Sequence, residues 1–479
     1  MLFRKGVLMS QKKWSFFIDK GGTFTDIIAK SPEGNIFVHK VLTDHSKGKD
    51  ESSLSGISDF IPLNDQPENQ IEVIKVGTTI GTNTLLQKKG PSLGFLTTEG
   101  FEDSIKIGYQ NRPHIFSLEV RKHPPLYSKS LGVKERVNSR GEILIPIEDK
   151  DIHNKLIFFQ SLGIKNIVVA FLHSLKNKTH EKRVYEIAKD MGFEQITLSS
   201  NFPIPKFILR SETAIIDSYL SPTIKNFSKH IQSFLPKAPL FFMQSLGGLV
   251  KSNYFQGSNS LLSGPAGGVI GAVKIAEAFG VDKIIGFDMG GTSTDVFHYA
   301  GQLERKNEHL ISNMKISIPM LDIHTLAAGG GSILKFDDDR FQVGPQSAGS
   351  DPGPSCYGHN GPLTITDANL ILGRILPESF SPNFGINKNM PLQTKDSFKN
   401  FDNLKNLMIN EDKDIYQIAE GFINIANQKM ALGLEKISKE RGIDLSSYSL
   451  ISYGGAGGQH SCDLAEMLGI KKVIIHPLS

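Results

Sequence analysis

The chain has 479 residues, of which 39% are hydrophobic and 21% charged, a balance typical of soluble globular proteins. Its length exceeds the usual limit of one hydrophobic core, and its net charge of +4 argues against a dedicated nucleic-acid surface. No apolar run approaches the roughly 20 residues that span a bilayer, and two cysteines, Cys356 and Cys462, argue against a disulfide framework. We therefore expect two or three domains in a reducing, cytoplasmic setting.

The first motif lies between two of three strands expected at 14–19, 23–30 and 36–42. It reads DKGGTFTD from residue 19, and it returns as DMGGTSTD from residue 288, again after an apolar run. Paired glycines let backbone N–H groups approach an anion, threonine hydroxyls add hydrogen bonds, and the leading Asp can hold a cation. Two such turns predict a two-sided grip on the phosphates of one nucleotide, whereas one copy alone would also fit a plain hairpin.

A strand expected at 71–76 ends in a threonine-rich loop, GTTIGTNT, that begins at Gly77. Its hydroxyls and amide suit a polar ligand, and a solvated turn with a threonine N-cap is the alternative. A further strand is expected at 93–97, and the segment 101–150 is rich in loops.

Residues 151–200 alternate between helix and strand, which predicts a parallel or mixed sheet. Pro203 and Pro205 follow, so we divide the chain into an N-terminal domain, 12–200, and a C-terminal domain, 201–479. The predicted helices and strands of the alternating part are 152–162, 166–170, 179–191 and 195–198.

The second half contains glycine loops at helix starts. The loop at 263–268 could contact a phosphate, or it could only permit close packing of the following helix. Its residues are compatible with both roles. The loop at 454–458 follows a strand, where N–H groups could contact a nucleoside, and a glycine C-cap with a linker is the alternative. Helices are expected at 212–220, 223–235, 269–279, 415–441 and 461–468, strands at 240–244 and 449–453, and an exposed polar insertion at 380–410.

Asp322 and His324 share one face of an expected strand, as a metal or proton-transfer pair would require, and a structural hydrogen bond fits equally. His173 and His460 stand alone and are expected to be ordinary surface or core histidines. Cys356 has no basic neighbour in sequence that would lower its pKa, so a nucleophilic role is not expected.

Together these motifs resemble the hydantoinase A/5-oxoprolinase family of ATP-dependent amidohydrolases, over about residues 14–477. The paired turns resemble the actin-like ATPase superfamily. The resemblance implies an α/β, actin-like (ribonuclease H-like) fold of two domains with the nucleotide in the cleft between them. The matching strings include DKGGTFTD, VGTTIGTNTLL, SGPAGGVIGA, FDMGGTSTDV, MLDIHTLAAGGGSI and YGGAGGQHSCDLAEMLGI.

The resemblance also implies a reaction, in which ATP phosphorylates the carbonyl oxygen of a 5-oxoproline- or hydantoin-type ring and water then opens it. Asp19 and Asp288 would orient Mg²⁺, and Asp295, with Asp26, would order the turns or polarise a water. The residues that would bind the phosphates are Gly21, Gly22, Thr23, Gly290, Gly291 and Thr292. Those that would bind the nucleoside are Gly454, Gly455 and Gly457. The substrate-side candidates are Thr78, Thr79, Asn83, Asp322 and His324.

The family further implies a hydantoinase B-type partner subunit, an oligomer, and room for a second divalent metal, with neither nucleic acid nor membrane as partner. Its members continue past His476-Pro477, so the chain is expected to lack their C-terminal region. Two rivals stay open. One is an acetone-carboxylase-like subunit that acts on a ketone and bicarbonate, and the other is a non-catalytic nucleotide-binding remnant.

Overall fold

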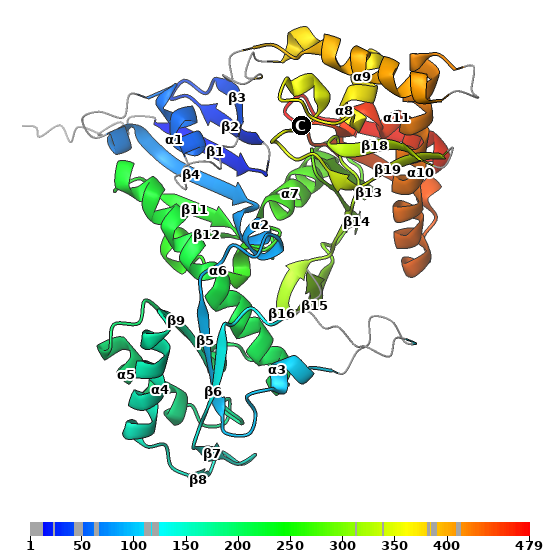
Figure 1. Cartoon of the computed structure of the whole chain (residues 1–479). Coiled ribbons are helices and arrows are strands. Elements are labelled where there is room, and N and C mark those ends of the chain that lie inside the picture. The colour runs from blue at the N-terminus through cyan, green and yellow to red at the C-terminus, as the bar shows by residue number, and fades with distance from the viewer. Residues whose placement is uncertain are drawn as a thin grey trace, which may run out of the picture.

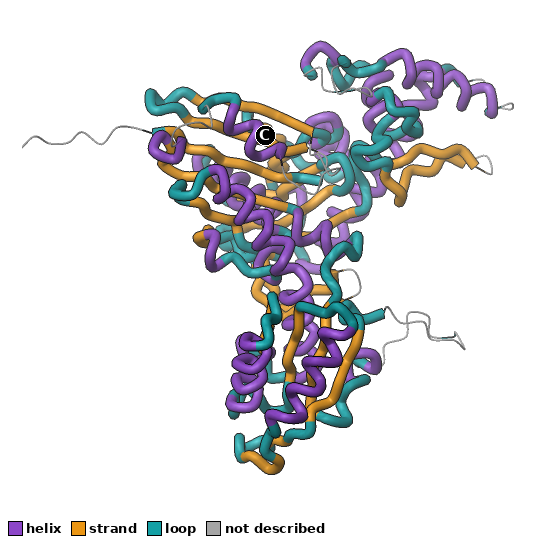
Figure 2. The backbone as a smooth tube through the Cα atoms, turned by 60° about the vertical axis from the view of Figure 1, so that its left-hand side comes forward, coloured by secondary structure: helices purple, strands orange, loops and turns teal. Residues whose placement is uncertain are grey.

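The computed structural model describes residues 13–22, 24–42, 51–61, 67–109, 116, 124–311, 314–337, 340–380, 384, 390–408 and 413–479. Two of its larger sheets lie side by side, and a third lies apart from them at the far end of a long helix (Figures 1 and 2). Within these residues, no helix is both long and apolar enough to cross a membrane.

The first sheet carries the first copy of the repeated motif on its β1–β2 hairpin. β1 pairs antiparallel with β2 and parallel with β4, which in turn pairs parallel with β11. Because β11 and β12 follow residue 200, the sheet draws strands from both sides of that position, and the division at residue 200 stays a prediction. In spatial order, the strands are β12 (Leu249–Lys251), β11 (Leu240–Met243), β4 (Ile71–Thr78), β1 (Trp14–Lys20), β2 (Phe24–Lys30) and β3 (Ile36–Leu42).

The second sheet repeats this plan with the second copy of the motif. β13 pairs antiparallel with β14 and parallel with β20, which pairs parallel with β21. Each sheet thus places one hairpin beside two parallel strands, which confirms the predicted mixed α/β class. The strands in spatial order are β17 (Ile323–Leu326), β14 (Thr294–Ala300), β13 (Lys283–Met289), β20 (Ser449–Tyr453) and β21 (Lys472–Ile475).

The third sheet is parallel throughout, as the helix–strand alternation of residues 151–200 predicts. Buried strands such as 166–170, in which all five residues are buried, pack against α4 (Asp149–Ser161) and α5 (Thr179–Asp190). The order is β10 (Gln195–Leu198), β9 (Asn166–Ala170), β5 (Leu93–Thr98) and β6 (Lys129–Val133). The loop-rich segment 101–150, between β5 and β9, also holds α3 (Ser104–Ile107), β7 (Arg136–Val137) and β8 (Ile143–Ile145).

One helix, α6 (Phe207–Phe234), replaces the two helices that we predicted on either side of Pro222. A proline removes one helical hydrogen bond, but burial along both halves of α6 stabilises the continuous helix. Figure 1 shows α6 running from the first sheet to the third. Two more helices near the motifs are α2 (Ile80–Leu86) and α7 (Ser263–Ala278), and α1 (Glu51–Ser58) covers the first sheet.

The expected exposed insertion at 380–410 is confirmed only in part among its described residues, because α9 exposes its polar face but buries apolar side chains. Phe401 and Met408 are buried because α9 (Thr394–Leu407) packs on α8 (Ile365–Ile371) and α10 (Ile415–Arg441). Phe384 and Leu392 are buried in a separate cluster around Cys356. The polar residues that suggested exposure lie on the outer face of an amphipathic helix. The remaining elements are α11 (Ser461–Met467) and the hairpins β15 (Arg305–Ile311)–β16 (Met314–Leu321) and β18 (Ser332–Asp337)–β19 (Arg340–Ser347).

Candidate functional site

The two copies of the motif fold into turns of the same geometry. In each copy the first and last Asp are cross-strand partners, and the N–H of the third residue donates to the carbonyl oxygen of the sixth at 3.0 Å. The residues are Asp19, Asp26, Gly21 and Phe24 in the first copy, and Asp288, Asp295, Gly290 and Ser293 in the second.

Both turns line one cavity of about 440 Å³, a size typical of small-molecule sites. The structure therefore brings together residues that the sequence placed in separate halves of the chain. Of the predicted set, the cavity is lined by Asp19, Gly21, Gly22, Asp26, Thr79, Asp288, Gly290, Gly291, Thr292, Asp295, Gly454 and Gly455. Thr23 lies outside the described residues. Gly457 is buried behind the loop, where an added β-carbon would lie 2.7 Å from the Ser452 hydroxyl.

Burial and neighbouring carboxylates raise the pKa of the leading Asp of each turn. Burial, and after it the charge of Asp26, raises the pKa of Asp19 to about 6. Burial and then Asp295 raise the pKa of Asp288 well above its usual range, and burial raises that of Asp295 to about 6. Although protein surrounds it, Asp19 remains open to water in the cavity. A divalent cation would relieve this repulsion, and carboxylate oxygens are ligands that Mg²⁺ prefers.

No group of three or more His, Cys, Asp or Glu side chains converges as a metal site within the described residues. A cation held by the leading Asp of each turn would therefore complete its shell with water and phosphate oxygens, as Mg²⁺ commonly does. The residues present fit such an ion and do not form a closed zinc site.

Glycine backbone lies against both leading carboxylates. An added β-carbon at Gly454, whose φ is +82°, would stand 2.3 Å from Asp288 Oδ1, and one at Gly264 would stand 3.0 Å from Asp19 Oδ1. Gly264 and Pro265 also line the cavity at the start of α7. The loop at 263–268, which the sequence left open between two roles, thus reaches the cavity.

The threonine-rich loop supports the first turn from behind. The Thr79 hydroxyl donates to the Lys20 carbonyl at 3.2 Å and accepts from the Asn83 amide at 3.2 Å. Asn83 lies beside Gly22, where an added β-carbon would be 3.4 Å from its Nδ2. Thr78 is fully buried, and its hydroxyl accepts from the Ile80 N–H at 3.1 Å. Thr79 therefore lines the cavity, while Thr78 shapes the start of α2.

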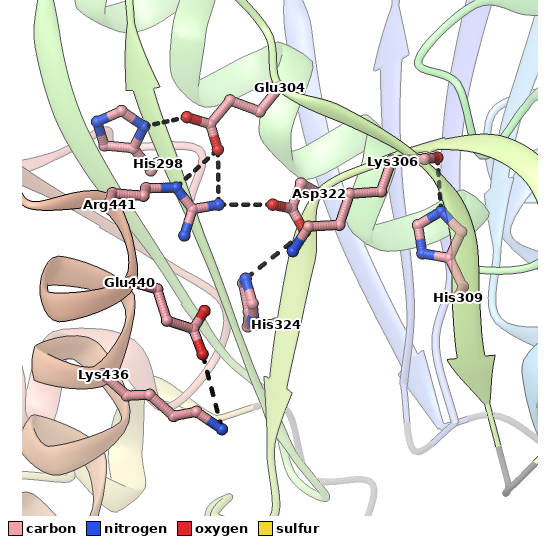
Figure 3. Close-up of polar contacts among 9 residues, drawn as sticks. All are labelled: His298, Glu304, Lys306, His309, Asp322, His324, Lys436, Glu440 and Arg441. Atoms are coloured by element: carbon pink, nitrogen blue, oxygen red, sulfur yellow. Dashed lines mark hydrogen bonds and ion pairs between the residues drawn. The ribbon is translucent and has the colours of Figure 1, made fainter.

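Asp322 and His324 do not line this cavity. Figure 3 shows them in an ionic cluster with Arg441 and Lys306, at 2.6 and 2.8 Å from the Asp322 carboxylate. Burial alone would raise the pKa of Asp322, but His324 and Lys306 lower it overall. The substrate-side role of the pair stays a prediction, and the cavity gives it no support.

Strand alternation explains where the pair lies. Thr325, the next residue along β17, donates its hydroxyl to Asp295, which lines the cavity. Since successive side chains point to opposite faces of a strand, His324 faces the other side, toward α10 and Arg441. The sequence pattern correctly gave Asp322 and His324 a common face but could not say which one.

The sequence missed Lys40 at the site, and it pointed to the triple-glycine loop of 329–331 without its role in supporting the second turn. Lys40 of β3 lines the cavity and donates to Asp26, its cross-strand neighbour. The register of the β2–β3 hairpin could have revealed this pair. The triple-glycine loop supports the second turn, because Gly330 and Gly331 donate their N–H groups to the carbonyls of Gly290 and Gly291 at 3.0 and 2.6 Å.

The remaining candidates are structural. His460 is fully buried between Asn427, 2.6 Å from its Nδ1, and Asn369, 3.0 Å from its Nε2. His173 is exposed. Burial, and after it the charge of Asp367, raises the pKa of the Cys356 thiol well above its usual range, so it is no nucleophile.

Comparison with known proteins places this geometry in context. The family model for hydantoinase/oxoprolinase matches residues 210–479, and that for the hydantoinase/oxoprolinase N-terminal region matches residues 15–192. A 5-oxoprolinase from Dictyostelium discoideum is 41% identical over 529 residues, which cover 98% of this chain and 42% of that protein. The caprolactamase subunit alpha of Pseudomonas jessenii is 31% identical over 490 residues, covering 98% of this chain and 69% of that subunit.

Solved structures agree with these matches. A nucleotide-free acetone carboxylase superposes with a TM-score of 0.80 at 25% identity, covering 96% of this chain and 68% of that one. The ATP-dependent caprolactamase from Pseudomonas jessenii gives a TM-score of 0.75 at 29% identity, with the same coverage of 96% and 68%. The chain thus spans about two fifths of the length of the 5-oxoprolinase and about two thirds of the solved chains.

Proposed function

Because this chain belongs to the hydantoinase/oxoprolinase family, we propose that it binds ATP with Mg²⁺ between its two glycine turns and phosphorylates a cyclic amide. The actin-like ATPase fold that the sequence implied is confirmed. The observation that carries the proposal is the pair of turns, equal in geometry, that line one cavity.

The proposed roles follow from the lining of the cavity. The backbone of 21–22 and the backbone and hydroxyl groups of 290–292 bind phosphate oxygens, and the loop at 454–456 contacts the nucleoside. Asp19 and Asp288 hold Mg²⁺, which when bound offsets phosphate charge. Among the described residues that line the cavity, Lys40 is the only Lys or Arg, and it adds a second positive charge. Asp295 orients a water or the turn itself.

The proposed reaction balances without a further reagent. The amide carbonyl oxygen attacks the γ-phosphorus, and the bond from that phosphorus to the ADP oxygen breaks. A first water then adds to the activated carbon, and the ring C–N bond breaks as the nitrogen takes a proton, which leaves an acyl phosphate. A second water hydrolyses the acyl phosphate and releases inorganic phosphate and the carboxylate. Positioning and charge neutralisation dominate the first step, and the rigid turns supply both.

We propose a lactam-type substrate of the 5-oxoproline or hydantoin class. The names of the matched relatives, 5-oxoprolinase and caprolactamase, support that class. We further propose that ring opening involves a hydantoinase B-type partner. The relative named caprolactamase subunit alpha supports a second subunit.

A second candidate is phosphorylation of a ketone and bicarbonate, favoured by the close superposition on acetone carboxylase. The two are separated by measuring ATP turnover with 5-oxoproline, with a hydantoin, and with acetone plus bicarbonate. Stimulation by either ring supports the first proposal, and stimulation by the ketone supports the second. ATP binding with no stimulation by any of them would identify a non-catalytic nucleotide-binding protein.

The phosphate grip itself is tested by isothermal titration of ATP·Mg²⁺ into Asp19→Ala and Asp288→Ala, with ATP turnover measured alongside. We expect each variant to bind at least about tenfold more weakly, because a metal-binding carboxylate is lost. Asp190→Ala, an exposed position at the end of α5, is the matched control. If both cavity variants bind and hydrolyse ATP like the parent, the assignment is wrong.

A further inference from the structure

A second cavity, of about 700 Å³, lies in the part of the molecule formed by the third sheet. Its lining comes from three short segments. The first follows β5, the second follows β9, and the third begins α6. None of these residues lines the cavity between the glycine turns. The lining is formed by 100–104, Ile107, Tyr109, Leu172 and 206–208.

The topology of the sheet explains why a cavity forms there. β5 and β9 are parallel neighbours, but the chain leaves β5 toward β6 on one side and leaves β9 toward β10 on the other. The two connections therefore diverge at the carboxyl ends of the strands. In open parallel sheets, this switch point is where ligands bind.

The walls of the cavity are aromatic and held in place. The rings of Phe101 and Phe207 meet edge to face at 5.9 Å and 81°, and the Arg136 guanidinium covers Phe101 at 5.4 Å. Arg210 is buried, and it donates to the carbonyls of Phe171 and Ile204, both at 3.1 Å. These two hydrogen bonds hold the backbone next to Leu172 and Lys206 in place, so the cavity is formed before any ligand binds.

The charged side chains that line the cavity differ in whether they already form an ion pair within the protein. Asp103 accepts from Lys106 at 3.0 Å, and Lys206 lies 3.7 Å from Glu308. Among the described residues, no ion pair involves Glu102, whose carboxylate lies over Gly132. The Ser104 hydroxyl is buried without a hydrogen-bond partner in the described structure. The groups left for a ligand are thus the Glu102 carboxylate and the hydroxyls of Ser104 and Tyr109, and each can accept a hydrogen bond.

We propose that this cavity binds a small planar aromatic molecule that carries an N–H donor. The ring lies among Phe101, Phe207 and Ile107. The N–H of the ligand donates to the Glu102 carboxylate, or to the Ser104 hydroxyl once the Ser104 side chain has rotated about χ1. A ring that bears a carboxylate is disfavoured, because Glu102 would repel it. This site is independent of the ATP site and of the function proposed above.

The test is isothermal titration of the whole chain with indole, with benzofuran, which has the same shape but no N–H, and with benzoate. We expect saturable binding of indole, weaker binding of benzofuran by about fivefold, and no binding of benzoate at about 5 mM. Equal affinity for indole and benzofuran would overturn the donor assignment. Displacement of indole by ATP·Mg²⁺ would overturn the placement outside the nucleotide cavity.

Two variants locate the site. Ile107→Trp fills the cavity from an exposed position, 51% accessible, and should weaken indole binding by at least about tenfold. Ile157→Trp, 55% accessible on α4, is the matched control and should bind like the parent. Glu102→Met should weaken indole by about fivefold and leave benzofuran unchanged. Unchanged indole binding in Ile107→Trp would place the ligand elsewhere and contradict the proposal.

Discussion

The backbone of Gly454 lies against the carboxylate of Asp288, so closely that a β-carbon there would stand 2.3 Å from Oδ1. The two residues come from the ends of neighbouring parallel strands, β20 and β13. The same residue 454 has φ of +82°, a conformation that glycine adopts without strain. The contact joins the glycine loop to the second turn, and it leads to the first prediction.

Gly454→Ala should weaken ATP binding by at least about tenfold, because the new methyl group must displace the Asp288 carboxylate and strain the backbone. Isothermal titration measures this. Gly455→Ala is the control, since an added β-carbon at the next residue meets nothing within 4 Å. Equal losses in both variants would show that the loop tolerates no side chain at all, which would contradict a specific role for the Asp288 contact.

Lys40→Met should raise the KM for ATP by about tenfold, because a positive charge beside Asp26 in the cavity is lost while the apolar stem is kept. Steady-state ATP turnover measures the change. Lys30→Met, at the exposed end of β2, serves as the comparison. An unchanged KM in the Lys40 variant would mean that this ammonium group does not contact the phosphates.

The buried His460 predicts a pH-dependent stability. Burial, and after it the charge of Arg374, lowers the pKa of His460 from 6.5 to about 4. The unfolded chain therefore binds this proton more readily, so the stabilisation is present above about pH 6.5 and is lost as the pH falls toward 4. The contribution is about 3 kcal/mol.

Urea unfolding across this pH range tests the effect. We expect the free energy of unfolding to decline less steeply in His460→Gln than in the parent, since the titrating group is gone. His153→Gln, at an exposed position of α4, should keep the parent's slope. Parallel profiles for the parent and the His460 variant would rule out this histidine as the source.

The Asp322 cluster predicts a loss of stability that is separate from activity. Asp322→Asn removes a carboxylate that pairs with both Lys306 and Arg441, while Arg441 keeps its pair with Glu304, so we expect about 2 kcal/mol of destabilisation in chemical unfolding. Glu435→Gln, which breaks the exposed pair with Lys439, should cost less than about 1 kcal/mol. A large fall in lactam-stimulated turnover at full stability would instead support the substrate-side role.

Much of the fold could be read from local pattern. The helices and strands at 166–170, 415–441 and 449–453 have the bounds expected from periodicity, because burial on one face imposes a regular spacing. The helix through Pro222 and the buried Phe401 were missed, since packing against distant segments outweighs a local helix breaker or a polar stretch.

The sequence by itself determined the two glycine turns, because turn chemistry and cross-strand register depend on residues a few positions apart. Only the tertiary structure decided that both turns line one cavity, that Gly454 lies on Asp288, and that His324 faces Arg441 rather than that cavity. The physical reason is the same in each case. A strand's pattern says which side chains share a face, whereas the pairing of distant strands decides what each face meets.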